Sequence, residues 1–84
     1  MQLREDDLAW HVSGDYIVVI DLAGPVELRL NRSGRVLWQA LAESATEREL
    51  VSVLVDTFGV DQHRAATDVA AFVADLRARK LVVD

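Results

Sequence analysis

The chain has 84 residues, which is enough for one modest hydrophobic core but not for a second domain or a large substrate cleft. The absence of cysteine excludes disulfides, zinc-thiolate sites and thiol nucleophiles. The net charge of −5 is concentrated near the start, because residues 1–31 hold six acids and two bases, whereas residues 61–84 hold four of each. This balance disfavours a nucleic-acid partner, which requires a basic surface.

The first seven residues are acidic and lack the basic start and apolar run of a signal peptide. No apolar stretch approaches the roughly 20 residues that span a bilayer. We therefore expect a single cytoplasmic domain over residues 1–84, in which residues 1–7 form a flexible tail.

Apolar residues recur with a period near two before residue 31, which predicts β-strands. Residues 8–13 and 16–21 flank a Gly14-Asp15 turn and are typical of an antiparallel hairpin. The break at Gly24-Pro25 separates this hairpin from a third strand, Val26 to Leu30, in which apolar and charged residues alternate.

The second and third strands carry features that bear on binding. Glu27 and Arg29 are charges of the kind that protect an edge strand from unintended pairing. The second strand is apolar on both faces from Tyr16 to Ile20, whereas helices on one side of a three-stranded sheet cover only one face. We therefore expect either the N-terminal segment or another protein to cover the second face.

After residue 31 the apolar period changes to about 3.6, which predicts helices. The first helix is capped by Asn31 or Ser33 and is expected to end near Glu43. A capping box at residues 46–49 begins the second helix, and Gly59 ends it in the way a left-handed C-cap residue does.

Asp61 caps a third and longest helix, which is expected to reach about Arg79. The apolar residues 81–83 either add a short strand or dock the end of the chain. The order of elements predicts an α+β domain of the winged helix-turn-helix type, with a three-stranded antiparallel sheet followed by three helices.

The sequence offers no catalytic or metal-binding constellation. His11 and His63 have no second ligand at helical spacing on a shared face, and the serines stand in turns, caps or a polar helix face. The adjacent carboxylates Asp6-Asp7 repel each other and are expected to be solvated. Trp10 and Trp38 are expected to pack in the core. We therefore expect no catalytic residue, no metal, no cofactor and no enzyme activity.

A series of core and cap residues follows one another in a characteristic order: Ile17 to Asp21, Leu30-Asn31, Gly34, Trp38, Leu41, Thr46, Phe58-Gly59-Val60, Asp68-Val69, Phe72-Val73, Leu76 and Lys80-Leu81. In order and spacing, residues 8–83 resemble the PqqD-like family, also called the RiPP precursor peptide recognition element. The resemblance implies a non-catalytic protein that binds the leader segment of a ribosomally made precursor peptide in natural product biosynthesis.

Among standalone family members, the chain is most similar to the leader-binding proteins of lasso peptide biosynthesis. These work with a separate cysteine-protease-like leader peptidase, so the resemblance implies such a peptidase or another modifying enzyme as a partner, beside the leader peptide itself. It implies neither a nucleic acid nor a membrane as a partner.

In the family, the leader lies as an added strand against the third strand, in a groove that the third helix completes. Such strand addition draws affinity from main-chain bonds and specificity from side-chain pockets. The resemblance therefore implies the peptide-binding residues Val26, Glu27, Leu28, Arg29 and Leu30 on the strand, and Val69, Phe72, Val73, Leu76 and Arg77 on the helix. For Val69 and Phe72 a purely structural role in the core is the alternative.

Two other functions are compatible with three helices and a small sheet. One is a winged-helix DNA-binding protein, whose recognition helix is then residues 61–79, although this helix begins with an acid, carries Asp68 and Asp75, and is neutral overall. The other is an adaptor that binds a folded partner through the face formed by Tyr16 to Ile20.

Overall fold

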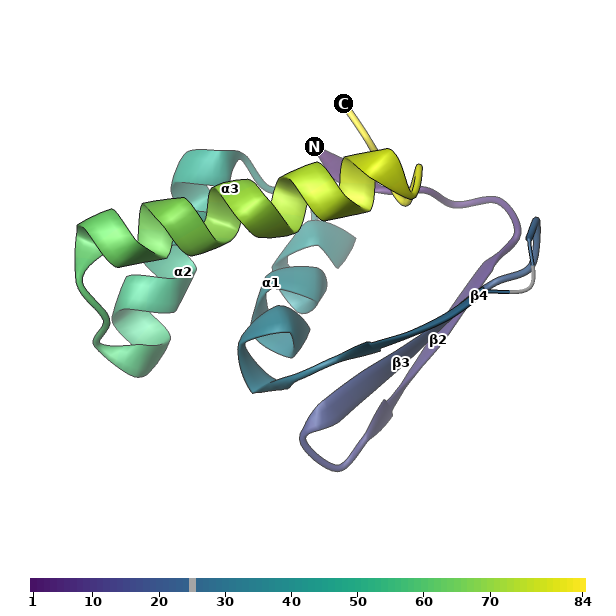
Figure 1. Cartoon of the computed structure of the whole chain (residues 1–84), viewed down its shortest axis with the longest axis horizontal. Coiled ribbons are helices and arrows are strands. Elements are labelled where there is room, and N and C mark those ends of the chain that lie inside the picture. Colours follow the sequence, from purple (N-terminus) through teal and green to yellow (C-terminus); the bar gives the residue numbers. More distant parts are fainter. Residues whose placement is uncertain (25) are drawn as a thin grey trace.

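A computed structural model describes residues 1–24 and 26–84, apart from the side chain of Val26. The elements are β1 (Gln2–Leu3), β2 (Leu8–Ser13), β3 (Tyr16–Asp21), β4 (Val26–Leu30), α1 (Arg32–Ala42), α2 (Glu47–Phe58), α3 (Gln62–Ala78) and β5 (Val82–Val83). The strands β2, β3 and β4 form an antiparallel sheet in that order, and β1 pairs with β5. Figure 1 shows this sheet extending away from the helices, with α3 lying across them and the two chain ends meeting near the end of α3.

The predicted α+β fold, three antiparallel strands followed by three helices, is confirmed. The hairpin and the third strand have the expected bounds. The predicted break at Gly24-Pro25 includes Pro25, which lies outside the described residues. Within the described part of the chain, no helix is long and apolar enough to cross a membrane.

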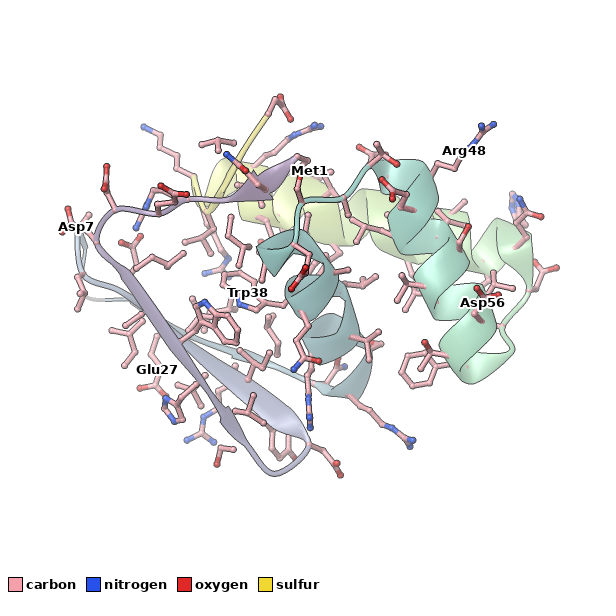
Figure 2. The ribbon with its side chains drawn as sticks, turned by 180° about the vertical axis from the view of Figure 1, so that it is seen from behind. Met1, Asp7, Glu27, Trp38, Arg48 and Asp56 are labelled. Atoms are coloured by element: carbon pink, nitrogen blue, oxygen red, sulfur yellow. The ribbon has the colours of Figure 1, made fainter. Side chains whose placement is uncertain are left out.

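The inner face of the three-stranded sheet packs against α1. Trp10 of β2, Val19 of β3 and Leu28 of β4 stand opposite one another in register, so they share this face. Trp38 of α1 is fully buried and lies between the sheet and the helices (Figure 2). The other buried apolar side chains are Leu3, Ile17, Leu30, Leu37, Leu41, Ala45, Leu50, Leu54, Ala65, Val69, Val73, Leu76, Leu81 and Val82.

Side-chain and glycine caps fix the ends of the helices. Asn31 accepts a hydrogen bond from the backbone N–H of Gly34 and so caps α1. Thr46 and Glu49 form the predicted capping box of α2. Gly59 ends α2 with φ of 65°, in the left-handed region that favours glycine.

Replacing Gly59 by alanine is expected to lower the free energy of unfolding by about 1–2 kcal/mol, because an L-residue is strained in the left-handed region. A Cβ at this position meets no heavy atom within 4 Å, so the backbone alone determines the loss. Urea unfolding followed by circular dichroism measures it. Gly24→Ala is the control, since Gly24 has neither a positive φ nor a close neighbour, and it is expected to change stability by less than about 0.5 kcal/mol. Equal losses in the two variants would contradict the backbone explanation.

The first residues of the chain differ from the prediction of a flexible tail at residues 1–7. Gln2–Leu3 form β1 and pair with Val83 and Val82, and the backbone N–H of Ala45 donates to the carbonyl of Met1. Leu3 is buried in the core, which gives this segment an apolar anchor. A two-residue strand is too short to produce a periodic signal in the sequence, so pattern reasoning overlooks it.

Arg4 ties this N-terminal segment to the rest of the domain. Its guanidinium contacts Asp21 Oδ1 at 2.6 Å and also donates to the backbone carbonyls of Asp6, Asp7 and Lys80. The Arg4 side chain therefore joins three separate segments: residues 4–7, the end of β3 and the residue that follows α3 and its C-cap.

The hydrogen bond from Arg4 lowers the pKa of the Asp21 carboxyl below its usual value of 3.8; partial burial opposes this, and the backbone N–H of Ala23 adds to it. Because the folded-state pKa is the lower one, the ionised carboxylate stabilises the native protein above the unfolded value and ceases to do so as pH falls through the folded value. We expect the difference in unfolding free energy between wild type and Asp21→Asn to be constant from pH 7 to pH 5 and to shrink below about pH 3.8. Urea unfolding at each pH measures this, and a difference that persists at pH 2 would contradict the ion pair's role.

The outer face of the three-stranded sheet is open. Ile17 and Val19 are buried on the inner face, whereas Tyr16 is 55% exposed and Val18 and Ile20 are half-buried. Of the two covers expected for this outer face, the N-terminal segment lies elsewhere, beside β5.

Candidate peptide-binding groove

A groove runs along β4 and faces α3. It has a volume of about 390 Å³ and an apolar floor contributed by all three helices and the strand. Its lining residues are Leu28, Arg29, Leu30, Asn31, Ser33, Gly34, Leu37, Leu54, Asp68, Phe72 and Asp75. Since β4 pairs only with β3 among the described residues, its other edge has unpaired backbone groups beside this groove.

A smaller hollow of about 120 Å³ adjoins the groove at Leu28, which lines both. The other walls are Val19 of β3 and Leu81, and the charged residues Asp21 and Arg79. The hollow is therefore apolar in its walls and has one acid and one base beside it. A small apolar side chain of a strand added to β4 fits the chemistry of this hollow.

Four of the predicted peptide-binding residues line the larger groove: Leu28, Arg29, Leu30 and Phe72. Leu28 and Phe72 are half-buried, so they combine a packed base with a free surface, whereas Leu30 is almost fully buried. Gly34 approaches Leu30 closely, because a Cβ on Gly34 comes within 3.2 Å of the Leu30 Cβ. The strand and α1 thus meet tightly at one end of the groove.

Other predicted peptide-binding residues lie below or beside the groove. Val69, Val73 and Leu76 are at most 1% exposed, so they support Phe72 from beneath and do not reach the surface. Glu27 is exposed and lies 3.5 Å from Arg29 as an ion pair. The side chain of Val26 lies outside the described residues, although its backbone belongs to β4.

Arg77 points to another side of α3. Its guanidinium pairs with Glu47 of α2 at 3.6 Å and with Asp84 at 3.1 Å, and it lines neither hollow. These exposed pairs contribute only about 0–1 kcal/mol each. Arg77 therefore links α3 to α2 and to the C-terminal residue.

The groove also contains Asp68 and Asp75, which the sequence does not single out for peptide binding. They stand four residues before and three residues after the predicted Phe72, so all three share one face of α3 beside the groove. The apolar stripe of α3 points about a quarter turn away from this face, because Val69, Val73 and Leu76 are the buried ones. The spacing of these three residues is visible in the sequence, but that they face a groove can be recognised only once the position of β4 is known.

The charges around the groove are largely paired within the domain. The Nε–H of Arg79 is shared between the two carboxylate oxygens of Asp75, each 3.2 Å away, and the Asp68 carboxylate lies 3.9 Å from the Arg64 guanidinium. A ligand in this groove therefore meets both apolar side chains, such as Leu28 and Phe72, and charged side chains that are held in weak, exposed ion pairs.

The described residues include no group of three or more histidine, aspartate or glutamate side chains placed to hold a metal ion. His11 and His63 are both exposed. The chemistry that the groove offers is the binding of an extended chain, with main-chain hydrogen bonds along β4 and apolar pockets for alternate side chains.

Proteins of known structure share this fold. Two solved structures match over the full length of both chains: "TbiB1 in Complex with the TbiA(beta) Leader Peptide", with a TM-score of 0.87 and 22% identity, and "Lasso peptide synthetase B1 complexed with the leader peptide", with a TM-score of 0.84 and 18% identity. These TM-scores show a shared fold, at sequence identities below 25%. No curated protein sequence matches the chain. A family model, that of coenzyme PQQ synthesis protein D (PqqD), matches residues 16–82, and the chain therefore belongs to the PqqD family.

Proposed function

We propose that this chain captures the leader segment of a ribosomally made precursor peptide and presents it to a separate enzyme. The leader adds as a strand to the free edge of β4 and places alternate side chains in the groove between β4 and α3. Lasso peptide maturation is the setting, and the enzyme is a leader peptidase of the cysteine-protease type or another modifying enzyme. The chain itself acts in the cytoplasm as a binding protein without catalysis.

The observation that carries this proposal is the free edge of β4 beside the groove that Leu28 and Phe72 line. An added strand makes main-chain hydrogen bonds to β4, and every second side chain then points toward Leu28 and Phe72. These two half-buried residues are the candidate anchors. Arg29 lines the groove and Glu27 pairs with it, so both supply rim charges worth about 0–1 kcal/mol each.

The shared fold supports the same proposal. Both structural neighbours are described as complexes with leader peptides, and each matches this chain over its whole length. The family membership agrees with a peptide-binding module, and the composition of the groove contains no constellation for catalysis.

The charge balance of α3 weighs against the DNA-binding alternative. Its two arginines, Arg64 and Arg77, are matched by two aspartates, Asp68 and Asp75, so the helix has no net positive charge. A recognition helix needs an excess of basic side chains for phosphates and base edges.

A fluorescence-anisotropy titration tests the proposal. The probe is a labelled leader peptide of the precursor encoded beside this protein's gene, titrated at low and at high salt. We expect saturable binding between micromolar and nanomolar Kd that changes little with salt, because apolar contacts and main-chain bonds dominate. Absence of binding to the folded protein would overturn leader capture, and a steep loss of affinity with salt would favour a charged ligand instead.

A further inference from the structure

The strand β2 forms a second free edge on the opposite side of the sheet from β4. Among the described residues it pairs only with β3. Its sequence from Leu8 to Ser13 contains no charged residue, in contrast to β4 with Glu27 and Arg29. Because exposed edges are usually protected by charges, this uncharged edge is open to pairing with another chain.

A pocket of about 310 Å³ lies between this edge, the N-terminal segment and the end of α1. Its lining residues are Gln2, Leu3, Arg4, Glu5, Leu8, Trp10 and Ala42. Trp10 is 38% exposed and packs edge-on against the buried Trp38, with ring centroids 6.2 Å apart and an angle of 79°. A partly exposed tryptophan that its neighbour holds in place is the kind of residue that anchors protein interfaces.

The pocket has an acidic border. Glu5, Asp6 and Asp7 are consecutive and exposed. Arg4 does not neutralise them, because its guanidinium is engaged with Asp21 and three backbone carbonyls. Negative charge therefore borders a pocket of mixed lining, in which Leu8 and Trp10 supply apolar surface beside the polar residues Gln2, Arg4 and Glu5. This combination is complementary to a basic surface with a protruding apolar side chain.

This surface and the β4–α3 groove lie on opposite sides of the domain. Figure 1 is seen from the side of α3, and Figure 2, seen from behind, brings the stretch from Met1 to Asp7 and β2 to the front. A peptide in the groove and a protein on the β2 surface are therefore able to bind at the same time.

We propose that the surface formed by β2, Trp10 and residues 5–7 docks a folded protein with a basic interface, which inserts an apolar side chain into the Trp10 pocket. The partner is the enzyme that receives the peptide held in the β4–α3 groove, and this identification rests on the proposed function. A second copy of the chain is disfavoured, because it carries a net charge of −5 and therefore does not supply the basic interface that residues 5–7 favour.

The experiment measures two affinities for each variant, one for the purified leader peptidase encoded beside this protein's gene and one for the labelled leader peptide. Trp10→Ala removes the anchor, and Asp6→Lys reverses one border charge on an exposed side chain. Asp56→Lys is the matched control, because Asp56 is exposed on α2 away from the N-terminal stretch and its change alters the net charge equally (Figure 2). Asp7 is left unchanged because its φ of 53° is unfavourable for lysine.

We expect Trp10→Ala and Asp6→Lys each to weaken peptidase binding at least about tenfold, Asp56→Lys to change it less than about twofold, and all three to bind the peptide as wild type does. Equal weakening by Asp6→Lys and Asp56→Lys would overturn the docking surface, as would wild-type affinity of Trp10→Ala and Asp6→Lys. Sedimentation offers a further check: if the wild-type protein is a dimer and Trp10→Ala makes it a monomer, the proposal is overturned, since a second copy then occupies the β2 edge. If the wild-type protein binds the peptidase but not the leader peptide, leader capture is refuted. If it binds the peptide but not the peptidase, docking is refuted.

Discussion

Replacing Phe72 by glutamate is expected to weaken leader-peptide binding at least about 100-fold while the domain remains folded. Phe72 is half-buried and lines the groove opposite β4, so an added strand covers it. A carboxylate there is desolvated by the bound peptide without a partner, and a 100-fold loss corresponds to about 2.8 kcal/mol. In the free protein, the same carboxylate remains accessible to water from the open groove.

The control for this variant is Ala74→Glu. Ala74 is exposed and lies two residues further along α3, so it points to nearly the opposite side of the helix. The two variants have the same charge, and an anisotropy titration compares them under identical conditions. We expect Ala74→Glu to bind within about twofold of wild type; equal losses in both variants would place the peptide elsewhere.

The largest loss of stability is expected for Trp38→Ala, at about 3–5 kcal/mol. Trp38 is fully buried between the sheet and the helices, and its removal leaves a cavity that α1 and the sheet cannot close without losing other contacts. Its indole N–H has no hydrogen-bond partner among the described residues, so its contribution comes from packing. A small domain has only about 5–15 kcal/mol of total stability, so this variant is expected to be partly unfolded at 37 °C.

Trp10→Ala is the matched comparison for Trp38→Ala. Trp10 is 38% exposed and loses mainly its edge-on contact with Trp38, which is worth about 0.5–1.5 kcal/mol beyond area burial. Urea unfolding monitored by far-ultraviolet circular dichroism avoids the fluorescence change that removing a tryptophan causes. A loss of unfolding free energy for Trp10→Ala as large as that for Trp38→Ala would contradict the assignment of Trp38 to the core and of Trp10 to its edge.

The sequence determines the order of the elements because each has a local cause. The hairpin turn, the Thr46 capping box and the left-handed Gly59 act within a few residues of themselves, and all three are found where they are predicted. Trp38 lies in the core as expected. Trp10 is only partly buried, since it stands on an edge strand and the helices cover its inner side incompletely.

The features that the sequence hides depend on residues far apart in the chain. The pairing of Gln2–Leu3 with Val82–Val83 and the contact of Arg4 with Asp21 bring together segments that no local pattern relates. The face of α3 that lies beside the groove is likewise recognisable only once β4 is in place. Arg77 illustrates the same limit, because its partners Glu47 and Asp84 are set by the packing of α3 on α2 and by the C-terminal segment.

Strand addition to β4 is the central claim, and amide hydrogen exchange measured by NMR tests it most directly. The exchange rates of wild-type protein are compared with and without a saturating amount of the leader peptide. The account predicts at least about tenfold slower exchange at the β4 amides that do not bond to β3, because the added strand accepts hydrogen bonds from them. Peptide binding that leaves β4 unchanged and instead protects β2 or the outer face around Tyr16 would contradict it.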